Sequence, residues 1–537
     1  MKPLIPIVML VVALTACERR PNDPPKSVPL PKTQTAASTH VLDVFPAAHA
    51  DAPSEIAWHA GDIESAFARA RQDNKPVFFY YGAVWCPPCN QVKATILSRR
   101  EFIERSRLFV PVYVDGDTRD GQRLAERFKV RGYPTMVLFK PDGSEITRLP
   151  GEVDFEQYLQ VLALGLNATQ PIKDTLTAAL AGRPLAREDW RRLAYYAWEA
   201  DEHQLVATGR LPVTLHKLAN ACPPVLTAAR TRLGLKAIAA ASAATPPAFS
   251  PAERKAAVAR MLDVLSNPRL VRENVDVIAG APEDIVRALS AVTAPERARL
   301  VAAWDRALRA LVLDTTLSNT DRLAAMNARV SLALLDDPDA RLTDAMIEDV
   351  RSEVVRADRE STNPYERQTV INAGAQVLTH AGLLDDSDQL LEAELERSPA
   401  PYYFMSSLAA NAKKRGNAKR ALEWYAKAYE QSRGPATRLQ WGANWIGALI
   451  ELAPNEERRI EDATVRVFGE FASATASIEG RNRAVLERLR GKLDAWNAKG
   501  DHAASLQRVK QRWAEVCAKL PADAQDRPRC ERVMSTA

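Results

Sequence analysis

Two cysteines separated by two prolines form the most reactive pattern in this sequence. The segment Cys86-Pro87-Pro88-Cys89 directly follows a short aromatic, apolar run and opens a predicted helix. At a helix N-terminus, unpaired backbone N–H groups and the helix dipole favour a thiolate over a thiol. A thiolate at Cys86 could attack a disulfide, and Cys89, one turn further along, could then release the product.

The two prolines are compatible with this position. The first N–H groups of a helix have no intrahelical partner, so proline is tolerated there. Because Pro87 and Pro88 carry no N–H, two potential donors near the Cys86 sulfur are lost. The backbone N–H of Cys89 is therefore the donor we expect for that sulfur.

The same spacing also occurs in zinc sites and in purely structural disulfides. This sequence has no second Cys-x-x-Cys, and its seven histidines never fall three or four residues apart. A tetrahedral site completed by neighbouring ligands is therefore not predicted. We expect a redox pair that needs no metal and no cofactor.

Net charge and glycine content argue against two further classes of function, nucleic-acid binding and phosphate binding by a glycine-rich loop. The 537 residues carry a formal net charge of +5, which gives no reason to expect nucleic-acid binding. With 22 glycines, the chain shows no glycine-rich loop of a phosphate-binding type. Length alone suggests several domains.

The elements around the cysteine pair alternate between strand and helix. Hydrophobic periodicity predicts the order βαβαββα after one leading helix. The strands are expected at 77–81, 108–114, 135–139 and 145–149, and the helices at 62–73, 86–97, 120–128 and 154–164. This is the order of a thioredoxin fold.

Residues 55–167 resemble a thioredoxin-family domain through Trp85, the two cysteines and the segment Gly132-Tyr133-Pro134-Thr135. They are most similar to the C-terminal domain of the thiol:disulfide interchange protein DsbD and to single-domain thioredoxins. The resemblance implies thiol–disulfide exchange, with Cys86 and Cys89 as catalytic residues. It also implies a cis peptide bond before Pro134 and a client-binding surface that includes Trp85, Tyr133 and Pro134.

The chain departs from the family pattern at two positions. Thioredoxins carry a buried aspartate where this chain has Tyr80, and a lysine where it has Pro111. The usual proton acceptor for the second cysteine is therefore missing. Tyr80, Tyr81 or a water could replace it, or the tyrosines could serve only strand packing. No histidine lies between the cysteines, which favours a reductase or isomerase over an oxidase.

The N-terminal residues predict export. An apolar run after Lys2 ends in Leu14-Thr15-Ala16-Cys17, which resembles the lipobox of bacterial lipoproteins. We predict a signal peptide over 1–17 and a lipidated Cys17 that anchors the protein in a bilayer. An ordinary cleaved signal peptide with an incidental cysteine is the alternative.

A proline-rich tether is predicted to follow over 18–54. The protein would then face the periplasm, and Glu18 after the lipidated cysteine favours the outer membrane. The expected partners are thiols and disulfides of exported proteins and a membrane or periplasmic thiol that supplies electrons.

The remaining residues, 175–537, predict a large all-α domain. A weak 34-residue similarity at 382–432 resembles a tetratricopeptide helix pair, so we expect helical hairpins of an α-solenoid type. Such stacks often present a concave protein-binding surface. One aromatic group could line that surface or fill the core: Trp424, Tyr425, Tyr429, Trp441 and Trp445.

Three cysteines remain. Cys517 and Cys530 flank a short proline-containing segment between two predicted helices, and a structural disulfide there is expected. Cys222 is then either a buried thiol or an internal partner of Cys86.

Two functions are consistent with the sequence. The first is a membrane-anchored thiol–disulfide oxidoreductase for exported proteins, whose helical domain selects or holds clients. The second is an assembly or scaffold lipoprotein that binds partners through its helical domain, with the redox module secondary. The intact pair of cysteines together with Tyr133-Pro134 favours the first.

Overall fold

A four-stranded mixed sheet occupies the N-terminal part of the computed structural model, which describes residues 55–130, 132–151, 155–201, 204–470, 478–520 and 526–534. The predicted signal peptide, lipidated Cys17 and tether lie outside these residues. The strand order is β2-β1-β3-β4, with β1 parallel to β2 and β3 antiparallel to both neighbours. The strands are β1 Val77–Gly82, β2 Val110–Asp115, β3 Thr135–Phe139 and β4 Glu145–Leu149.

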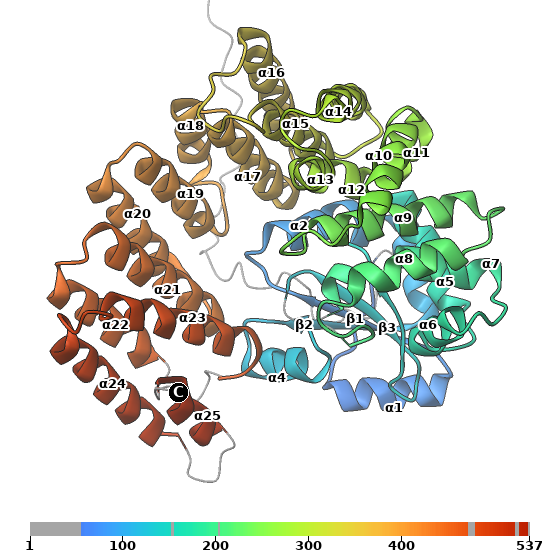
Figure 1. The fold of residues 1–537 in the computed structure, drawn as a ribbon. Coiled ribbons are helices and arrows are strands. Elements are labelled where there is room, and N and C mark those ends of the chain that lie inside the picture. Colours follow the sequence, from blue (N-terminus) through green and yellow to red (C-terminus); the bar gives the residue numbers. More distant parts are fainter. Residues whose placement is uncertain are drawn as a thin grey trace, which may run out of the picture. The chain divides into compact units, whose positions relative to one another are not determined.

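Helices cover both faces of this sheet (Figure 1). Alternate residues of β1 point to opposite faces. Phe79 and its neighbours pack against α1 and α4, whereas Phe78 packs on the other face against Phe102 of α3. The helices of this part are α1 Ile63–Asp73, α2 Pro87–Val92, α3 Arg100–Arg105, α4 Arg119–Arg127 and α5 Phe155–Leu166.

The order of these elements is that of the thioredoxin fold predicted from the sequence, with α3 as an additional short helix. The helix that begins after Cys86 continues beyond α2 as a π-helical turn over Lys93–Leu97. The strand predicted to start at residue 108 instead starts at Val110. Residues Ser106–Leu108 form a 3-10 turn, which leaves Leu108 exposed.

The rest of the described chain is helical, as predicted. Its helices are α6 Ile172–Leu180, α7 Arg187–Tyr195, α8 Leu211–Ala221, α9 Thr227–Ser242, α10 Pro251–Leu265, α11 Pro268–Glu273, α12 Val275–Gly280, α13 Pro282–Leu289, α14 Pro295–Leu313, α15 Asn319–Ala333, α16 Asp344–Glu360, α17 Pro364–His380, α18 Leu384–Glu394, α19 Pro401–Lys414, α20 Ala418–Gln431, α21 Pro435–Leu452, α22 Glu457–Gly469, α23 Gly480–Trp496, α24 Ala503–Ala518 and α25 Asp526–Met534. None of the helices in the described ranges is both long and apolar enough to cross a bilayer.

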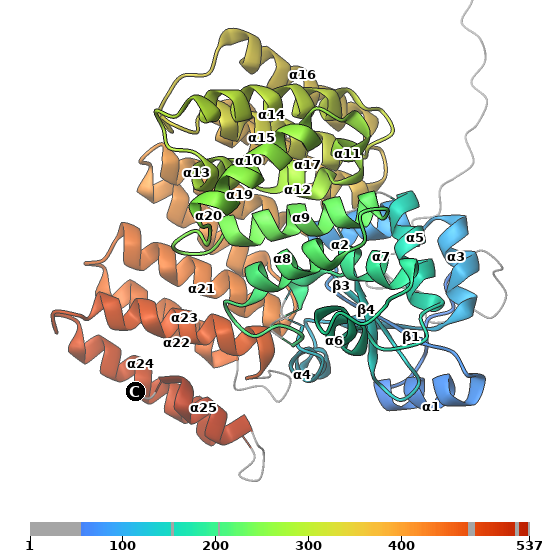
Figure 2. The same cartoon turned by 45° about the vertical axis from the view of Figure 1, so that its right-hand side comes forward.

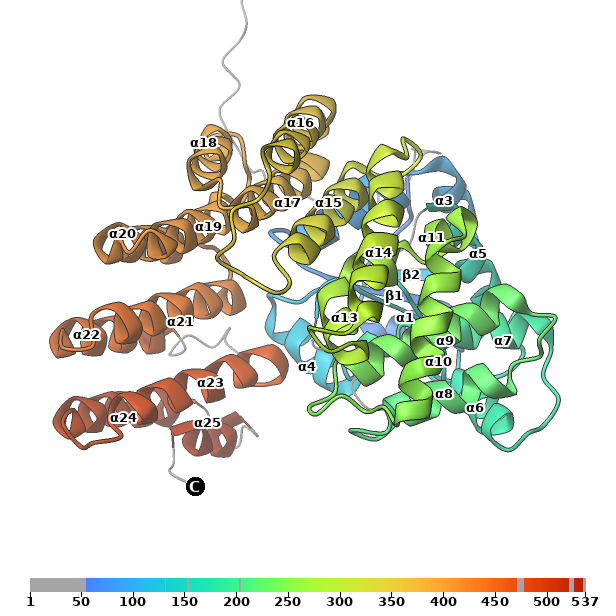
Figure 3. The ribbon, with the colours of Figure 1, turned by 45° about the horizontal axis from the view of Figure 1, so that its top comes forward.

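Successive helices from α17 to α22 pack in pairs, α17 with α18, α19 with α20 and α21 with α22 (Figure 3). Gly382 and Gly416 follow the first helix of two of these pairs and both adopt positive φ, 77° and 72°. A left-handed residue at this position ends a helix and favours glycine. The 34-residue similarity in the sequence corresponds to these two equivalent turns.

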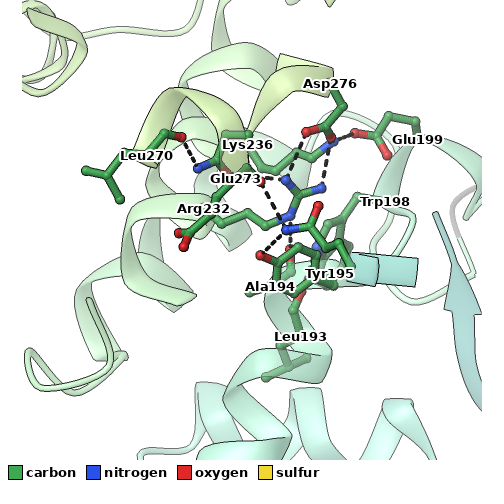
Figure 4. A network of polar contacts seen from close by, with 12 residues as sticks. Leu193, Ala194, Tyr195, Trp198, Glu199, Arg232, Lys236, Leu270, Glu273 and Asp276 are labelled. Atoms are coloured by element: carbon green, nitrogen blue, oxygen red, sulfur yellow. Dashed lines mark hydrogen bonds and ion pairs between the residues drawn. The ribbon is translucent and has the colours of Figure 1, made fainter. Parts of the chain in front are cut away.

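A buried ionic cluster holds α9 and α12 together (Figure 4). Arg232 donates two hydrogen bonds to Asp276, of 2.9 and 2.8 Å, and Lys236 lies 3.0 Å from the same carboxylate. Burial alone would raise the pKa of Asp276, but the two adjacent cations hold it below its ordinary value. Such a cluster tolerates burial because every charge has a partner.

The sheet and the helices belong to one compact unit. The helices α8 and α9 pack side by side as a hairpin (Figure 2), while α17 contacts α2 and α23 contacts α4. Cys86 and Cys89 lie in the same hydrophobic cluster as residues of α17 to α25. The helical region therefore forms part of the environment of the redox pair.

Candidate redox site

Cys86 and Cys89 lie at the start of α2 and are joined as a disulfide. Cys86 is the N-cap residue, with extended backbone, and Pro87 and Pro88 occupy the first two helical positions. The backbone N–H of Cys89 donates to the Cys86 sulfur over 3.2 Å. This confirms the donor expected from the two prolines and places one orphan N–H where it would stabilise a thiolate.

Both sulfurs are covered. The exposed fraction is 3% for Cys86 and 0% for Cys89. Much of the cover comes from α17, which binds the backbone around the cysteine pair. The Gln368 side chain donates to the carbonyl of Trp85 over 2.9 Å, and the Thr369 hydroxyl donates to the carbonyl of Pro87 over 2.6 Å.

Asn90 adds a third contact to α17. Its side-chain amide donates to the side-chain carbonyl of Gln368 and to the backbone carbonyl of Val84. Gln368 therefore both donates to and accepts from the loop and helix that carry the cysteines. Sequence reasoning missed this residue, because nothing in the helical periodicity of α17 marks Gln368 as different from other polar positions.

Trp85 lies beneath the helical region rather than on a free surface, with 4% of its area exposed. Its ring packs edge-on against Trp441 of α21, with centroids 5.1 Å apart, and stacks against Tyr403 of α19 with centroids 6.4 Å apart. The guanidinium of Arg481, in the first turn of α23, lies 5.0 Å from the ring centre. The client-binding role expected for Trp85 remains a prediction, and in this structure helices occupy its surface.

Asp117 connects this ring to α21. Its carboxylate accepts a hydrogen bond of 2.8 Å from the indole N–H of Trp85 and one of 2.5 Å from the Thr437 hydroxyl. Burial raises the pKa of Asp117 to about 6, against the lowering effect of these donors. A side chain at Gly434, where φ is 83°, would come within 3.0 Å of the carboxylate.

The Tyr133–Pro134 peptide bond is cis, as the resemblance implies. The Tyr133 ring stacks on Tyr81 with centroids 5.0 Å apart, and the Arg481 guanidinium lies 4.9 Å from the centre of the Tyr133 ring. A Cβ at Gly116 would lie 2.1 Å from the Tyr133 ring, so only glycine fits there. Tyr133 and Pro134 are half-exposed, and their role in client binding remains a prediction.

Tyr80 and Tyr81 are buried on opposite faces of β1. Burial raises the pKa of both phenols, so each keeps its proton at neutral pH. The Tyr80 hydroxyl lies 3.4 Å from the carbonyl of Cys89, to which it donates. A phenol that stays protonated cannot accept the Cys89 proton, which favours packing as the role of these tyrosines.

Two charged groups are buried on the α2 side of the sheet, and the sequence analysis did not single them out. Lys93 lies one turn after Cys89, and burial lowers its pKa to about 8 despite the nearby Asp115. Burial also raises the pKa of Asp115 at the end of β2. A lysine among the apolar positions Val92 and Ile96 was the available signal for this pair.

The other three described cysteines form one disulfide and one free thiol. Cys517 of α24 and Cys530 of α25 are joined as a disulfide, and both are fully buried. Cys222 is a buried free thiol whose burial raises its pKa to about 11. No group of three or more potential metal ligands occurs in the part of the chain that the structure describes.

The aromatic residues noted in the sequence differ in burial, and one of them lies against the redox site. Trp424, Tyr429 and Trp441 are buried, whereas Tyr425 and Trp445 are half-buried. Trp441 is the member that contacts Trp85. Its indole N–H donates to the carbonyl of Tyr402 over 2.9 Å.

Comparison with known proteins agrees with this geometry. Residues 63–165 match the family described as thioredoxin-like domain. This segment is a thioredoxin-like domain. It is 33% identical over 103 residues to the thiol:disulfide interchange protein DsbD of Pseudomonas fluorescens, which covers 18% of this chain and 18% of that protein.

Thioredoxins themselves are also similar to the thioredoxin-like domain. The thioredoxin of Mycobacterium bovis is 37% identical over 78 residues, which are 14% of this chain and 63% of the relative. The solution structure of a thioredoxin from Thermus thermophilus shares 32% identity over 20% of this chain and 85% of its own, with a TM-score of 0.19. The chain spans about one fifth of the length of the DsbD protein that it matches.

Proposed function

We propose that this protein is a thiol–disulfide oxidoreductase that acts on exported proteins through Cys86 and Cys89. The observation that carries the proposal is the Cys86–Cys89 disulfide at the start of α2, with the Cys89 N–H directed at the Cys86 sulfur. The match of residues 63–165 to thioredoxin-like domains supports the same chemistry.

The reaction transfers two electrons. In the reduced protein, the Cys86 thiolate attacks one sulfur of a client disulfide, and the second client sulfur leaves as a thiolate that takes up a proton. The Cys89 thiol loses its proton and attacks Cys86, so the first client sulfur leaves in turn. The client ends as a dithiol and the protein as the Cys86–Cys89 disulfide, which an external thiol donor must reduce again.

The direction of exchange and the location are further parts of this proposal. The absence of histidine between the cysteines supports a reductase or isomerase role. The lipobox-like segment ending at Cys17 supports a lipid anchor on the periplasmic face of a bacterial membrane, with the outer membrane favoured. Cys17→Ala should move the protein to the soluble fraction or block its processing; unchanged partitioning and maturation would contradict the anchor.

Trapping of mixed disulfides tests the exchange reaction. In full-length Cys89→Ser, the resolving thiol is absent, so clients should accumulate as adducts on Cys86 that reducing agents release. Cys86→Ser is the matched control and should trap nothing, because Cys89 lies deeper, inside the first turn of α2, whereas Cys86 is the N-cap residue. Non-reducing electrophoresis followed by mass spectrometry of the adducts gives the readout.

The same variants separate the oxidoreductase from the scaffold. A scaffold should hold the same partners non-covalently in the Cys86→Ser/Cys89→Ser double variant, whereas an exchange enzyme should lose most of them. If Cys89→Ser forms no reduction-sensitive adduct under exporting conditions, the proposed function is wrong.

A further inference from the structure

A cavity of about 480 Å³ lies beside Trp85, bordered by the inner helices of the hairpins. The exchange reaction as proposed makes no use of it. Three of these helices each contribute two residues spaced four apart, a spacing that places both side chains on one face of a helix. The pairs are Asn372 and Gln376 on α17, Tyr403 and Ser407 on α19, and Gln440 and Asn444 on α21. We call the surface formed by these six residues the amide groove.

The six side chains of the amide groove are polar and uncharged, and apolar side chains such as Trp85 and Trp441 line the rest of the cavity. No carboxylate lines the cavity, and its single cation is Arg481, which lies over the rings of Trp85 and Tyr133. An amide side chain carries both a donor and an acceptor, as a peptide unit does. Within the described residues, the side chains of Asn372, Gln376 and Ser407 make no hydrogen bond, so these groups are available to a ligand.

The amide groove lies beside the redox loop, because Trp85, the residue before Cys86, lines the same cavity. Gln368, which donates to the carbonyl of Trp85, precedes Asn372 and Gln376 by one and two turns on the same face of α17. One row of amide side chains therefore runs from the backbone beside Cys86 into the cavity. A ligand held on this row has one end at the thioredoxin-like domain.

We propose that the amide groove binds an extended, uncharged segment of the client protein and presents its cysteine to Cys86. Packed helices lie about 8–10 Å apart, and an extended chain advances about 3.3 Å per residue, so three residues span one helix-to-helix step. Each helix could thus pair with the backbone of every third residue. This inference rests on the proposed function and adds the form in which the client is recognised.

Binding of an unfolded protein in the absence of exchange tests the groove. The probe is ribonuclease A that has been reduced and alkylated with iodoacetamide, which leaves it unfolded and without free thiols and adds no charge. Native ribonuclease A is the folded comparison. Both are titrated against full-length Cys86→Ser/Cys89→Ser. We expect Asn372→Ala, Gln376→Ala, Ser407→Ala and Asn444→Ala together to weaken binding of the unfolded probe about tenfold or more.

The matched control is Gln389→Ala with Gln431→Ala, two exposed glutamines on the outer helices α18 and α20, which should leave the affinity unchanged. With the cysteines restored, the groove variant should exchange with a small aromatic disulfide at the parent rate. A photo-crosslinking residue at position 376 should label the probe, and one at position 389 should not, which gives a readout without removing side chains.

Equal affinity of groove variant and parent, or equal labelling from positions 376 and 389, would overturn the inference. So would a dimer in solution that the groove variant abolishes, because a second copy would then be the occupant. These outcomes leave exchange with the small disulfide intact and so leave the proposed function standing. A parent that fails to exchange with the small disulfide would instead remove the proposed function itself.

Discussion

Asp117 is a buried carboxyl group that accepts hydrogen bonds from both the redox loop and the helical region. Its carboxylate accepts from Trp85 on one side and from Thr437 on the other. Both donors favour the ionised form, yet burial outweighs them and raises the pKa to about 6. The structure therefore contains a carboxyl group beside the active-site tryptophan that changes charge close to neutral pH.

The raised pKa predicts how stability depends on pH. Between about pH 4, the ordinary pKa of aspartate, and pH 6, the folded state holds this proton while the unfolded chain has lost it. The folded state binds more protons in this window, so the free energy of unfolding falls as pH rises through it. Relative to the Asp117→Asn variant, the free energy of unfolding of the parent should fall by on the order of 2 kcal/mol between pH 4 and 6.5.

Chemical denaturation across this pH range measures the difference. Asparagine can still accept from Trp85 and Thr437 but does not titrate, so groups common to both proteins cancel in the comparison. Parallel stability curves for the two proteins would show that Asp117 keeps its charge throughout this window.

A second residue-scale prediction concerns the proton of Cys89. The pKa of Tyr80 is raised by burial, so Tyr80→Phe should change the rate of client release very little. Asp115, a buried carboxyl whose pKa is raised by burial, lies on the same side of the sheet as Tyr80 and beside Lys93. If it accepts the proton, Asp115→Asn should slow release from the Cys86 mixed disulfide by about a hundredfold.

Single-turnover release of a thiol chromophore from Cys86 gives this rate directly, and its pH profile should lose one ionisation in Asp115→Asn. If Tyr80→Phe slows release equally, Tyr80 would instead be the acceptor of the Cys89 proton. The sequence showed that the family's aspartate and lysine were missing here but could not locate a substitute, because Lys93 in the turn after α2 and Asp115 at the end of β2 come together only in the folded chain.

At the scale of elements, α17 packs on α2 and binds the loop that carries the redox pair. It supplies donors to the carbonyls of Trp85 and Pro87 and accepts from Asn90. The 34-residue similarity over 382–432 predicted helical hairpins that begin just after α17. It could not predict that contact, because side-chain pairing over about 280 residues leaves no periodic signal.

Removing the α17 contacts should open the site. Gln368→Ala with Thr369→Val deletes three hydrogen bonds, each of which contributes about 1 kcal/mol net, so we expect reduced Cys86 to alkylate at least about tenfold faster. The measurement uses the Cys89→Ser background and mass spectrometry of the Cys86 peptide after timed exposure to a maleimide. An opening of this kind should also increase the yield of trapped clients.

Gln389→Ala with Thr177→Val is the matched control, since both side chains are exposed and neither lies on α17. It should leave the alkylation rate unchanged. A lower melting temperature without faster alkylation in the α17 variant would mean that these contacts stabilise the fold but do not limit access.

At the scale of the whole molecule, a segment beyond the thioredoxin-like domain packs on the edge of its sheet. β4 is an edge strand of the sheet, and an unpaired edge is prone to aggregation. The segment after α7 covers it: the Ala197 N–H donates to the carbonyl of Arg148 over 3.2 Å, and the Tyr196 hydroxyl donates to Glu145. The sequence predicted each strand of the sheet closely, and the boundary at 167 followed from the amphipathic helix predicted at 154–164.

This packing predicts which fragment of the protein folds. Arg148 is fully buried, and its guanidinium donates to the carbonyls of Phe128, Lys129 and Ala200. A fragment of residues 55–167 exposes the edge of β4 and leaves this guanidinium with fewer partners, whereas residues 55–201 keep both intact. We expect the longer fragment to be a soluble monomer and the shorter one to aggregate or to melt at least about 5 °C lower.

Size-exclusion chromatography and thermal melting by circular dichroism compare the fragments. Ala197→Pro in the longer fragment is the matched control: φ is already −76° there, so proline fits the backbone and removes only the N–H that pairs with Arg148. It should lower the melting temperature by less than the truncation does, because Tyr196 and the Ala200 carbonyl remain in place. If residues 55–167 instead melt as high as 55–201 and stay monomeric, the cover on β4 contributes no stability, and the thioredoxin-like domain folds independently of the helices that follow it.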